Sequence, residues 1–378
     1  MTKIDIRYPK EAMAKSRERM AAHREFRYVD RVPVVAGISA RYTLQQRGVG
    51  FREFFNSPEA QVYHQLMNLK WRLENLREDF LLSPVVNVVP DFQNVVPAAF
   101  FAEATVVFDD ETPPWVLPCI QDTSQVESLR VPTPTANIGL KHGEFFVRMR
   151  EAVKEYEVTI NGEPVPLNVS PGGMGGSNIS AAIKLAGENV LAWMLECPEV
   201  VHRLLDKICR ARLNFVAHMA ELSGKPLKSG GGGGDGAEML SPRLFREFMI
   251  PYYERCHQAG PNRGLHMCGR INHLLDVLMN DLKITSLDGF GSVADRQLVA
   301  EKMAGRIHLR GNVDCVVLRN GPREAIRREC FDALERLSRR GGFVLSDGHN
   351  IAPGTPVEHV NLMAACAEEF GPPALVRA

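Results

Sequence analysis

Net charge and long apolar runs are both missing from this sequence of 378 residues. Lysine and arginine together number 45, as do aspartate and glutamate, so the formal net charge is zero. A neutral chain offers no general electrostatic attraction for nucleic acid or an anionic membrane. No apolar stretch of about 18 residues could span a bilayer, and the charged N-terminal residues lack the apolar core of a secretory signal. We therefore expect a cytoplasmic protein with neither nucleic acid nor a membrane as a partner.

Cysteine pairs of the CxxC type are also absent, although the chain contains eight cysteines. A chain of this length does not need disulfides to fold, and cytoplasmic thiols are mostly reduced. We expect most of these cysteines to be small, buried hydrophobic residues. Only Cys268 has a suggestive neighbour, His266, two positions before it. The glycine-rich segments match neither the GxxxxGK[ST] nor the GxGxxG pattern, so nucleotide binding is not predicted.

Short apolar runs alternate with long amphipathic segments along most of the chain. The hydrophobic content of 45% and the charged content of 24% are those of an ordinary globular protein. Helical periodicity is clearest at 198–222, where apolar residues recur three and four positions apart. Strands are expected at 32–38, 85–89, 165–169, 226–229, 264–267, 284–287, 307–310 and 342–345. About eight strand–helix units favour a closed (β/α)8 barrel, the TIM barrel of the α/β class, over an open sheet.

The chain is predicted to form a single domain over 1–378, with an N-terminal helical extension over 1–30. Residues 90–134 contain many prolines and are too long for a plain turn after the second strand. We expect a long loop or lid there, with Trp115 as its anchor. The five glycines at 230–234 are predicted to form a tight connection between strand 226–229 and the helix that begins after Ser241.

Polar residues follow most of the expected strands, and a barrel of this class places its reactive groups at the C-terminal ends of its strands. The residues expected to meet at that end are Asp91, Asn168, Gly233, Asp235, His266, Cys268, Asp288, Asn312, Asp314 and His349. Their convergence predicts an active site. The glycine-rich loops beside them are as consistent with backbone crowding at the rim as with binding of an anion.

His266 and Cys268 are candidate metal ligands. Residues two apart in an extended segment point to the same face, so an imidazole and a thiolate could bind one ion, and zinc prefers these ligand types. His349 would arrive from the last strand, and Asp288 from the strand beside His266. Spacing alone favours a simpler alternative, in which a buried His266 bonds a backbone carbonyl and Cys268 fills space.

Five segments resemble the uroporphyrinogen decarboxylase superfamily and, within it, the corrinoid-linked methyltransferases. They read DRVPV at 30–34, LSPRLFREFMIPYYERC at 240–256, GLHMCGRINHLLDVL at 264–278, RIHLRGNVD at 306–314 and GFVLSDGHNIAPGTPVEHV at 342–360. The resemblance implies a TIM barrel, in agreement with the strand count, and a homodimer.

The resemblance also implies which branch the chain is similar to. The decarboxylase carries an arginine-rich segment that binds tetrapyrrole carboxylates, whereas residues 34–42 here, VVAGISARY, contain only Arg41. The zinc methyltransferases bind metal through His-x-Cys and a later cysteine. His266 and Cys268 match the first two of these ligands, and His349 departs from the third. The related cobalamin-independent methionine synthases place a carboxylate where Asp288 stands.

The resulting hypothesis is a methyltransferase with zinc held by His266, Cys268 and His349, and with Asp288 as a weak ligand. The zinc would activate a thiol or hydroxyl that exchanges a methyl group with a corrinoid (cobalamin) on a separate protein. The residues expected to bind or orient the small methylated substrate are Asn168, Gly233, Asp235, Asn312 and Asp314. One alternative is a metal-independent lyase that acts on a carboxylated substrate through Asp91 or Asp235. Another is a non-enzymatic protein that binds corrinoids or methylated compounds.

Overall fold

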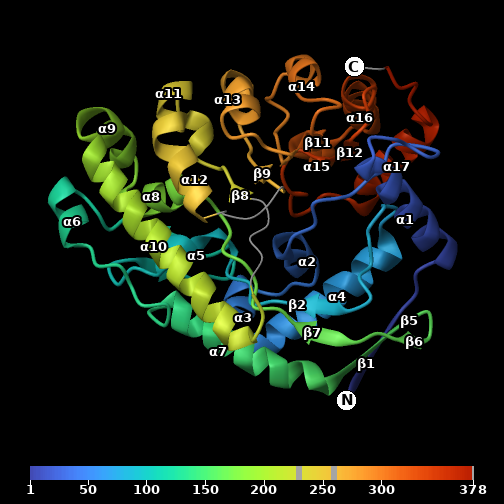
Figure 1. Cartoon of the computed structure of the whole chain (residues 1–378). Coiled ribbons are helices and arrows are strands. Elements are labelled where there is room, and N and C mark those ends of the chain that lie inside the picture. The colour runs from blue at the N-terminus through green and yellow to red at the C-terminus, as the bar shows by residue number, and fades with distance from the viewer. Residues whose placement is uncertain (227–231, 257–261, 377–378) are drawn as a thin grey trace.

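The computed structural model describes residues 1–226, 232–256 and 262–376 (Figure 1). Its strands are β1 (Thr2–Ile6), β2 (Val86–Val88), β3 (Thr105–Val107), β4 (Trp115–Leu117), β5 (Tyr156–Ile160), β6 (Glu163–Pro164), β7 (Leu167–Val169), β8 (Gly232–Gly233), β9 (Gly264–His266), β10 (Ser286–Asp288), β11 (His308–Val313) and β12 (Phe343–Asp347). Its α-helices are α1 (Lys10–Arg24), α2 (Ala40–Gln46), α3 (Phe51–Asn56), α4 (Pro58–Asn75), α5 (Val96–Ala99), α6 (Thr123–Ser128), α7 (Ile138–Ala152), α8 (Asn178–Ala186), α9 (Asn189–Glu196), α10 (Pro198–Ser223), α11 (Pro242–Leu244), α12 (Ile250–Cys256), α13 (Leu275–Asn280), α14 (Arg296–Lys302), α15 (Cys315–Asn320), α16 (Arg323–Leu337) and α17 (Val357–Phe370).

The central sheet contains five parallel strands in the order β12-β11-β10-β9-β8. Strands β2 and β7 form a second parallel pair, and Val34 makes an isolated parallel bridge to Leu345 of β12. Helices follow the strands along the chain and lie around them (Figure 1). This arrangement confirms the α/β class. The described strands are not hydrogen-bonded into one closed ring, so barrel closure remains a prediction.

Two expected strands differ from the prediction. Residues 32–38 form no strand beyond the bridge at Val34, because the buried carboxylates of Asp79 and Glu78 accept hydrogen bonds from the Val34 and Ala36 N–H groups. The strand expected at 226–229 lies almost wholly outside the described residues. Strand β8 instead occupies Gly232–Gly233, so this part of the glycine run, expected to be a strand-to-helix loop, is itself a strand. A Cβ on Gly233 would lie 2.9 Å from the Gly176 carbonyl carbon, which explains the glycine at this position of β8.

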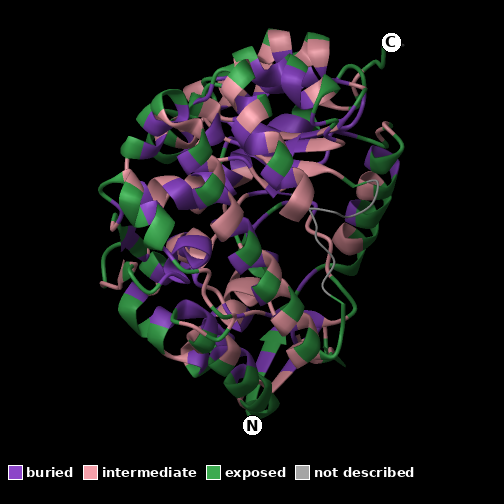
Figure 2. Cartoon of the chain, turned by 60° about the vertical axis from the view of Figure 1, so that its left-hand side comes forward, coloured by how far each residue is buried: buried purple, intermediate pink, exposed green. Residues whose placement is uncertain are grey.

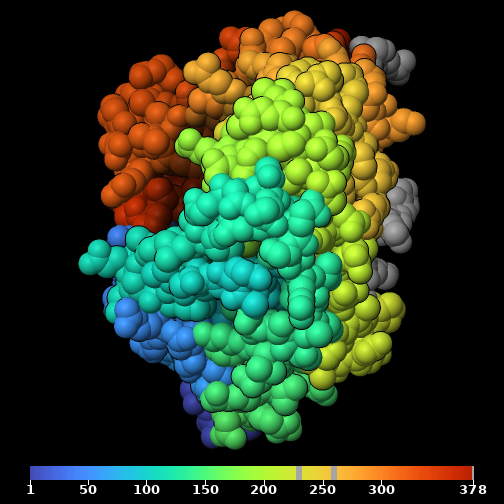
Figure 3. Space-filling view, turned by 90° about the vertical axis from the view of Figure 1, so that its left-hand side faces the viewer, coloured from blue at the N-terminus to red at the C-terminus, as the bar shows by residue number. Residues whose placement is uncertain are grey.

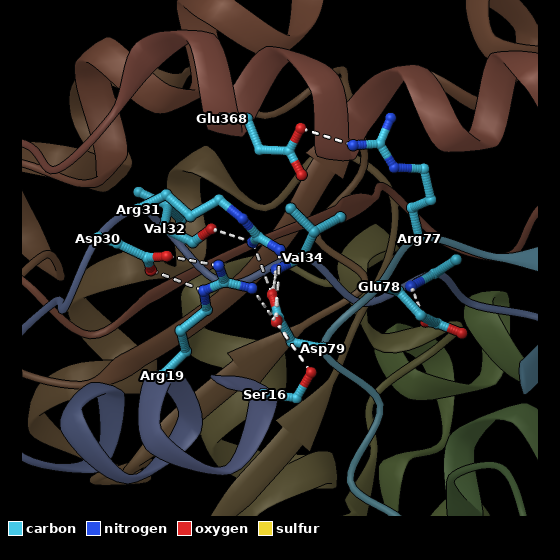
Figure 4. Close-up of polar contacts among 11 residues, drawn as sticks. Ser16, Arg19, Asp30, Arg31, Val32, Val34, Arg77, Glu78, Asp79 and Glu368 are labelled. Carbon is cyan, nitrogen blue, oxygen red and sulfur yellow. Dashed lines mark hydrogen bonds and ion pairs between the residues drawn. The ribbon is translucent and has the colours of Figure 1, made fainter. Parts of the chain in front are cut away.

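The N-terminal extension contains a strand as well as a helix, which corrects the expectation of a purely helical segment. Strand β1 pairs in parallel with β5 along its whole length. A buried ion cluster then holds α1 against the rest of the chain (Figure 4). In this cluster the Asp79 carboxylate accepts hydrogen bonds from Arg19 Nη1 at 3.0 Å and from Arg31 Nη1 at 2.6 Å.

Residues 90–134 fold into short elements: α5, the antiparallel hairpin β3–β4, and α6. In Figure 3 this segment, coloured cyan to teal, lies across one face of the molecule. Phe100 is fully buried, with its ring centroid 5.0 Å from that of Phe215 on α10. Trp115 is 38% exposed, so the prediction that it anchors the segment is wrong. Phe100 has that role because its side chain lies at a helix-to-helix contact, and the lid role remains a prediction.

The hydrophobic core lies between the strands and the inner faces of the helices, where Figure 2 shows most of the buried residues. Helix α10 confirms the periodicity at 198–222, because its apolar residues at three- and four-residue spacing, from Val200 to Ile208, are buried. In the part of the chain that the structure describes, no helix is both long enough and apolar enough to cross a membrane.

Candidate active site

A cavity of about 480 Å³ runs along β8, β9 and β10. Its walls include Gly233, His266 and Asp288, which are direct neighbours across the three parallel strands. Neighbouring residues of paired strands project from the same face of a sheet. The strand register therefore brings these residues together in one wall, and the glycine-rich loop at 174–176 also lines the cavity.

His266 is held in one orientation by two contacts. Its Nδ1 lies 2.6 Å from Asp288 Oδ1. This hydrogen bond raises the pKa of the imidazole, although burial opposes the shift. The ring also lies against Gly289, where an added Cβ would come within 2.2 Å of His266 Cε1 and where φ is +67°. In the neutral imidazole, Nδ1–H donates to Asp288 and Nε2 is left as the free acceptor.

Cys268 is paired with Asp235 at the start of the segment after β8. Both the Cys268 thiol and its backbone N–H donate to Asp235 Oδ1, each at 3.2 Å. Burial and the neighbouring Asp235 charge raise the pKa of the thiol to about 12. Asp235 Oδ2 also lies 3.8 Å from His266 Nε2. Asp235 therefore connects the two residues of the His-x-Cys motif, and the thiol is neutral at pH 7.

His349 lies beside His266, with 5.4 Å between the ring centroids. Burial and the neighbouring His266 lower the pKa of the His349 imidazole. The structure thus brings His349 and the His-x-Cys motif to the same end of the sheet. Within residues 1–226, 232–256 and 262–376, no three His, Cys, Asp or Glu side chains are already arranged as a metal-binding group.

Asp91 belongs to a second polar cluster. Its carboxylate accepts hydrogen bonds from the Gln93 backbone N–H at 2.9 Å and from Gln93 Nε2 at 2.8 Å. Burial raises the pKa of Asp91. Gln93 has a positive φ of 56°, a sparsely populated conformation for a residue with a side chain. Arg41 Nε donates to Gln93 Oε1 at 3.3 Å, which places a guanidinium beside this carboxyl group.

Lys184 is a charged residue near the cavity that the sequence reasoning missed. It lies on α8, and its Nζ donates to Ser180 Oγ at 2.7 Å. Burial lowers the pKa of the lysine, while the Asp235 charge opposes that shift. Its signal in the sequence was weak because a lysine on an amphipathic helix is typical of a solvent-exposed face.

Comparison with known proteins now identifies the family. The protein-family model described as "Uroporphyrinogen decarboxylase (URO-D)" matches residues 88–370 of this chain. The chain belongs to the uroporphyrinogen decarboxylase family. A uroporphyrinogen decarboxylase from Xanthomonas oryzae pv. oryzae is 29% identical over 212 residues, which cover 52% of this chain and 55% of that protein. The chloroplastic uroporphyrinogen decarboxylase 2 of Oryza sativa subsp. japonica is 28% identical over 169 residues, 43% of this chain and 41% of that protein.

The chain thus spans only about half the length of the first of these curated relatives. A solved structure with a similar fold is a methyltransferase from Methanosarcina mazei. Its TM-score is 0.65 at 22% identity, and the match covers 94% of this chain and 99% of that one. At this identity the likeness shows the fold alone. These findings confirm the superfamily that the motifs resembled.

In this member of the uroporphyrinogen decarboxylase family, three expected substrate-binding residues are not among those that line the cavity along β8, β9 and β10. Asn312 is fully buried, and its Oδ1 accepts a hydrogen bond from Arg296 Nε at 2.8 Å. Asp314 caps α15 and accepts from Ser292 Oγ at 2.6 Å. Asn168 donates to Asn87 Oδ1 at 2.7 Å within the β2–β7 pair. Packing and capping contacts already engage polar atoms of Asn312 and Asp314, and a role of these two residues in substrate binding stays a prediction.

Proposed function

We propose that this chain is a methyltransferase. It would move a methyl group between a small methylated substrate, or a thiol or hydroxyl acceptor, and a corrinoid carried by a separate protein. The observation that carries the proposal is the His266–Asp288 pair beside the Cys268–Asp235 pair. Each pair joins a side chain that can ligate metal to a carboxylate that sets its orientation and protonation. The likeness in fold to the Methanosarcina mazei methyltransferase agrees with this proposal.

The donor set fits zinc in its chemistry. His266 keeps Nε2 free because Nδ1 is bonded to Asp288, and a neutral imidazole nitrogen is a usual zinc ligand. Cys268 and His349 would be the other two ligands. Zinc bound by these residues would supply Lewis acidity that lowers the pKa of a bound thiol or hydroxyl. Asp288 would then orient His266, which replaces the weak-ligand role predicted for it from the sequence.

Asp235 would act as the acceptor of the thiol proton. Its Oδ1 already accepts a hydrogen bond from Cys268 Sγ at 3.2 Å. The raised pKa of the thiol means that Cys268 becomes a thiolate only when a competing cation displaces its proton. Asp235 would take up that proton, and the nearby Lys184 ammonium would stabilise the carboxylate before transfer.

We also propose that the strands close into a TIM barrel. The segment at Val34 would lie between β12 and β2, since Val34 already bridges to Leu345 of β12. Strand β7 would lie beside β8, and the close approach of Gly233 to Gly176, seven residues after the end of β7, supports that order.

The remaining substrate-binding proposals are Gly233 and Asn168, and residues 90–134 would act as the lid.

The test combines metal analysis with a methyl-transfer assay on the full chain. Purified protein supplied with zinc and then dialysed should retain about one zinc per chain. His266→Ala, Cys268→Ser and His349→Ala should each lose it, whereas His218→Ala and Cys119→Ser, which replace no proposed ligand, should keep it. Demethylation of methylcobalamin by an added thiol should follow zinc content across the series. Full activity in zinc-free protein would refute the proposed mechanism.

A carboxy-lyase is the second candidate, and Asp91 is the observation that favours it. Burial raises the pKa of this carboxyl group, so it holds a proton to higher pH than an exposed aspartate does. Arg41 offers a cation for a substrate carboxylate, and the curated relatives bear the name uroporphyrinogen decarboxylase. Release of CO2 from uroporphyrinogen, lost in Asp91→Asn but not in the exposed control Asp276→Asn, would establish this alternative. No CO2 release by the wild-type chain would remove it.

A further inference from the structure

Two cysteines outside the candidate active site lie in direct contact. Cys209 is on α10 and Cys256 is the last residue of α12, and their sulfur atoms are 3.0 Å apart. Both are free thiols, since a disulfide bond is about 2.05 Å long. Cys209 is fully buried, whereas Cys256 is partly exposed. The expectation that most cysteines are small, buried hydrophobic residues does not account for this pair.

Cys256 lies beside a buried cation that lacks a carboxylate partner. Arg212 on α10 is only 6% exposed, and among the described residues it forms no ion pair with an aspartate or glutamate. A buried guanidinium is costly unless an anion compensates it. The hydrogen bond from Cys209 holds the pKa of the Cys256 thiol below its usual range; burial opposes this, and the Arg212 charge adds to it. Cys256 also accepts a hydrogen bond from Asn178 Nδ2 at 3.4 Å.

The same arginine holds the glycine-rich loop of the cavity. Arg212 Nη1 donates to the Gly176 carbonyl at 3.1 Å, and Nη2 donates to the Met174 carbonyl at 3.3 Å. Met174 and Gly176 both line the cavity that contains His266 and Asp288. The charge state of Cys256 therefore acts on a guanidinium that fixes one wall of the candidate active site.

We propose that Cys209 and Cys256 form a redox-active dithiol, which peroxide converts reversibly into a disulfide. Formation of the disulfide alters the hydrogen bonds from Arg212 to the loop at 171–177. The Cys256 thiolate sulfur would attack hydrogen peroxide, the O–O bond would break, and hydroxide would leave, giving a sulfenic acid. The Cys209 sulfur would then attack the Cys256 sulfur. The S–O bond breaks, water leaves with the Cys209 proton, and the disulfide forms. In total, one peroxide is reduced to two waters while two thiols are oxidised.

A second pair of cysteines provides an internal comparison. Cys330 on α16 and Cys366 on α17 also form a thiol–thiol hydrogen bond, but both are fully buried. Peroxide can reach the first pair through the partly exposed Cys256, whereas it has no such access to the second. The two pairs thus separate the effect of contact from the effect of access.

The experiment treats the reduced full-length chain with a small excess of hydrogen peroxide. The free thiol count should fall from eight to six. Digestion and mass spectrometry should find one cross-linked peptide pair, joining Cys209 to Cys256 and lighter by two hydrogen atoms, which dithiothreitol restores. The same cross-link should form in Cys268→Ser, so the result does not depend on the proposed function. A count that stays at eight, sulfinic acid at Cys256 without a cross-link, or equally fast cross-linking of Cys330 to Cys366 would overturn the proposal.

Variants separate the chemistry from simple loss of structure. In Cys209→Ser the Cys256 sulfenic acid has no thiol to react with, so dimedone should trap it. Arg212→Met should slow oxidation about tenfold by removing the cation that favours the thiolate, and Arg212→Lys should restore most of the rate. Hydrogen exchange of the peptide that contains 171–178 should be faster in oxidised than in reduced protein. Equal exchange in the two forms would refute the coupling to the loop.

Discussion

Replacing Asp79 by alanine should destabilise the folded protein more than any change to an exposed ion pair. Asp79 is 1% exposed and accepts hydrogen bonds from Ser16 Oγ, Arg19 Nη1, Arg31 Nη1 and the Val34 N–H (Figure 4). Without it, Arg19 keeps its second partner Asp30, but Arg31 keeps only the Val32 carbonyl. Removing one partner of a buried ion pair leaves an uncompensated charge and costs about 3 to 5 kcal/mol. We therefore expect a loss of about that size in the free energy of unfolding.

The same region contains a matched control. Arg77 and Glu368 form an ion pair at 2.7 Å near the cluster (Figure 4), but their side chains are 59% and 46% exposed. Glu368→Ala should change the free energy of unfolding by less than about 1 kcal/mol, because water solvates the arginine that remains. Urea unfolding followed by far-UV circular dichroism measures both variants, with the transition checked for intermediates. If Asp79→Ala and Glu368→Ala were equally stable, the buried cluster would not hold α1 as described.

Three further changes test the site and the core. In Asp288→Asn the pKa of His266 should fall, as an NMR titration of the imidazole would show, because the charge-assisted hydrogen bond that raises it is lost. The pKa of His266 is raised in the folded state, so the stabilisation from this bond is fully present below pH 6.5. That stabilisation is lost as the pH rises through the raised pKa. The free energies of unfolding of wild type and variant should therefore converge at higher pH. Gly289→Ala should displace the His266 ring and reduce zinc retention, whereas Gly291→Ala, whose added Cβ would meet its nearest atom at 3.6 Å, should not. Phe100→Ala should cost about 3 to 5 kcal/mol in urea unfolding, and a loss below about 1 kcal/mol would mean that residues 90–134 only cover the core.

The parts of the fold that could be predicted from sequence are those whose signal is local. Helix α10 and strands β9 and β10 follow from periodicity and short apolar runs. Residues 32–38 are as apolar as a central strand. The carboxylate that accepts the hydrogen bond from the Val34 N–H lies 45 residues further along the chain, so no local pattern indicates it. Strand β8 consists of glycine alone, so it has no side-chain pattern to detect. The environments of Asn312 and Lys184 depend on residues from other segments, Arg296 for Asn312 and Asp235 for Lys184, which no local pattern records.

The buried ion cluster and the candidate active site are connected through the segment that failed to form a strand. Asp79 fixes Val34, and Val34 bridges to Leu345 of β12. Three residues after Val34, the Gly37 N–H donates to Asp347 Oδ1 at 2.6 Å, and a Cβ on Gly37 would come within 2.6 Å of the other carboxylate oxygen. Asp347 ends β12 only two residues before His349. The position of His349, one of the three proposed zinc ligands, therefore depends on contacts made by the N-terminal part of the chain. Placing the proposed ligands on the C-terminal strands of another chain would therefore not reproduce the position of His349 without these N-terminal contacts.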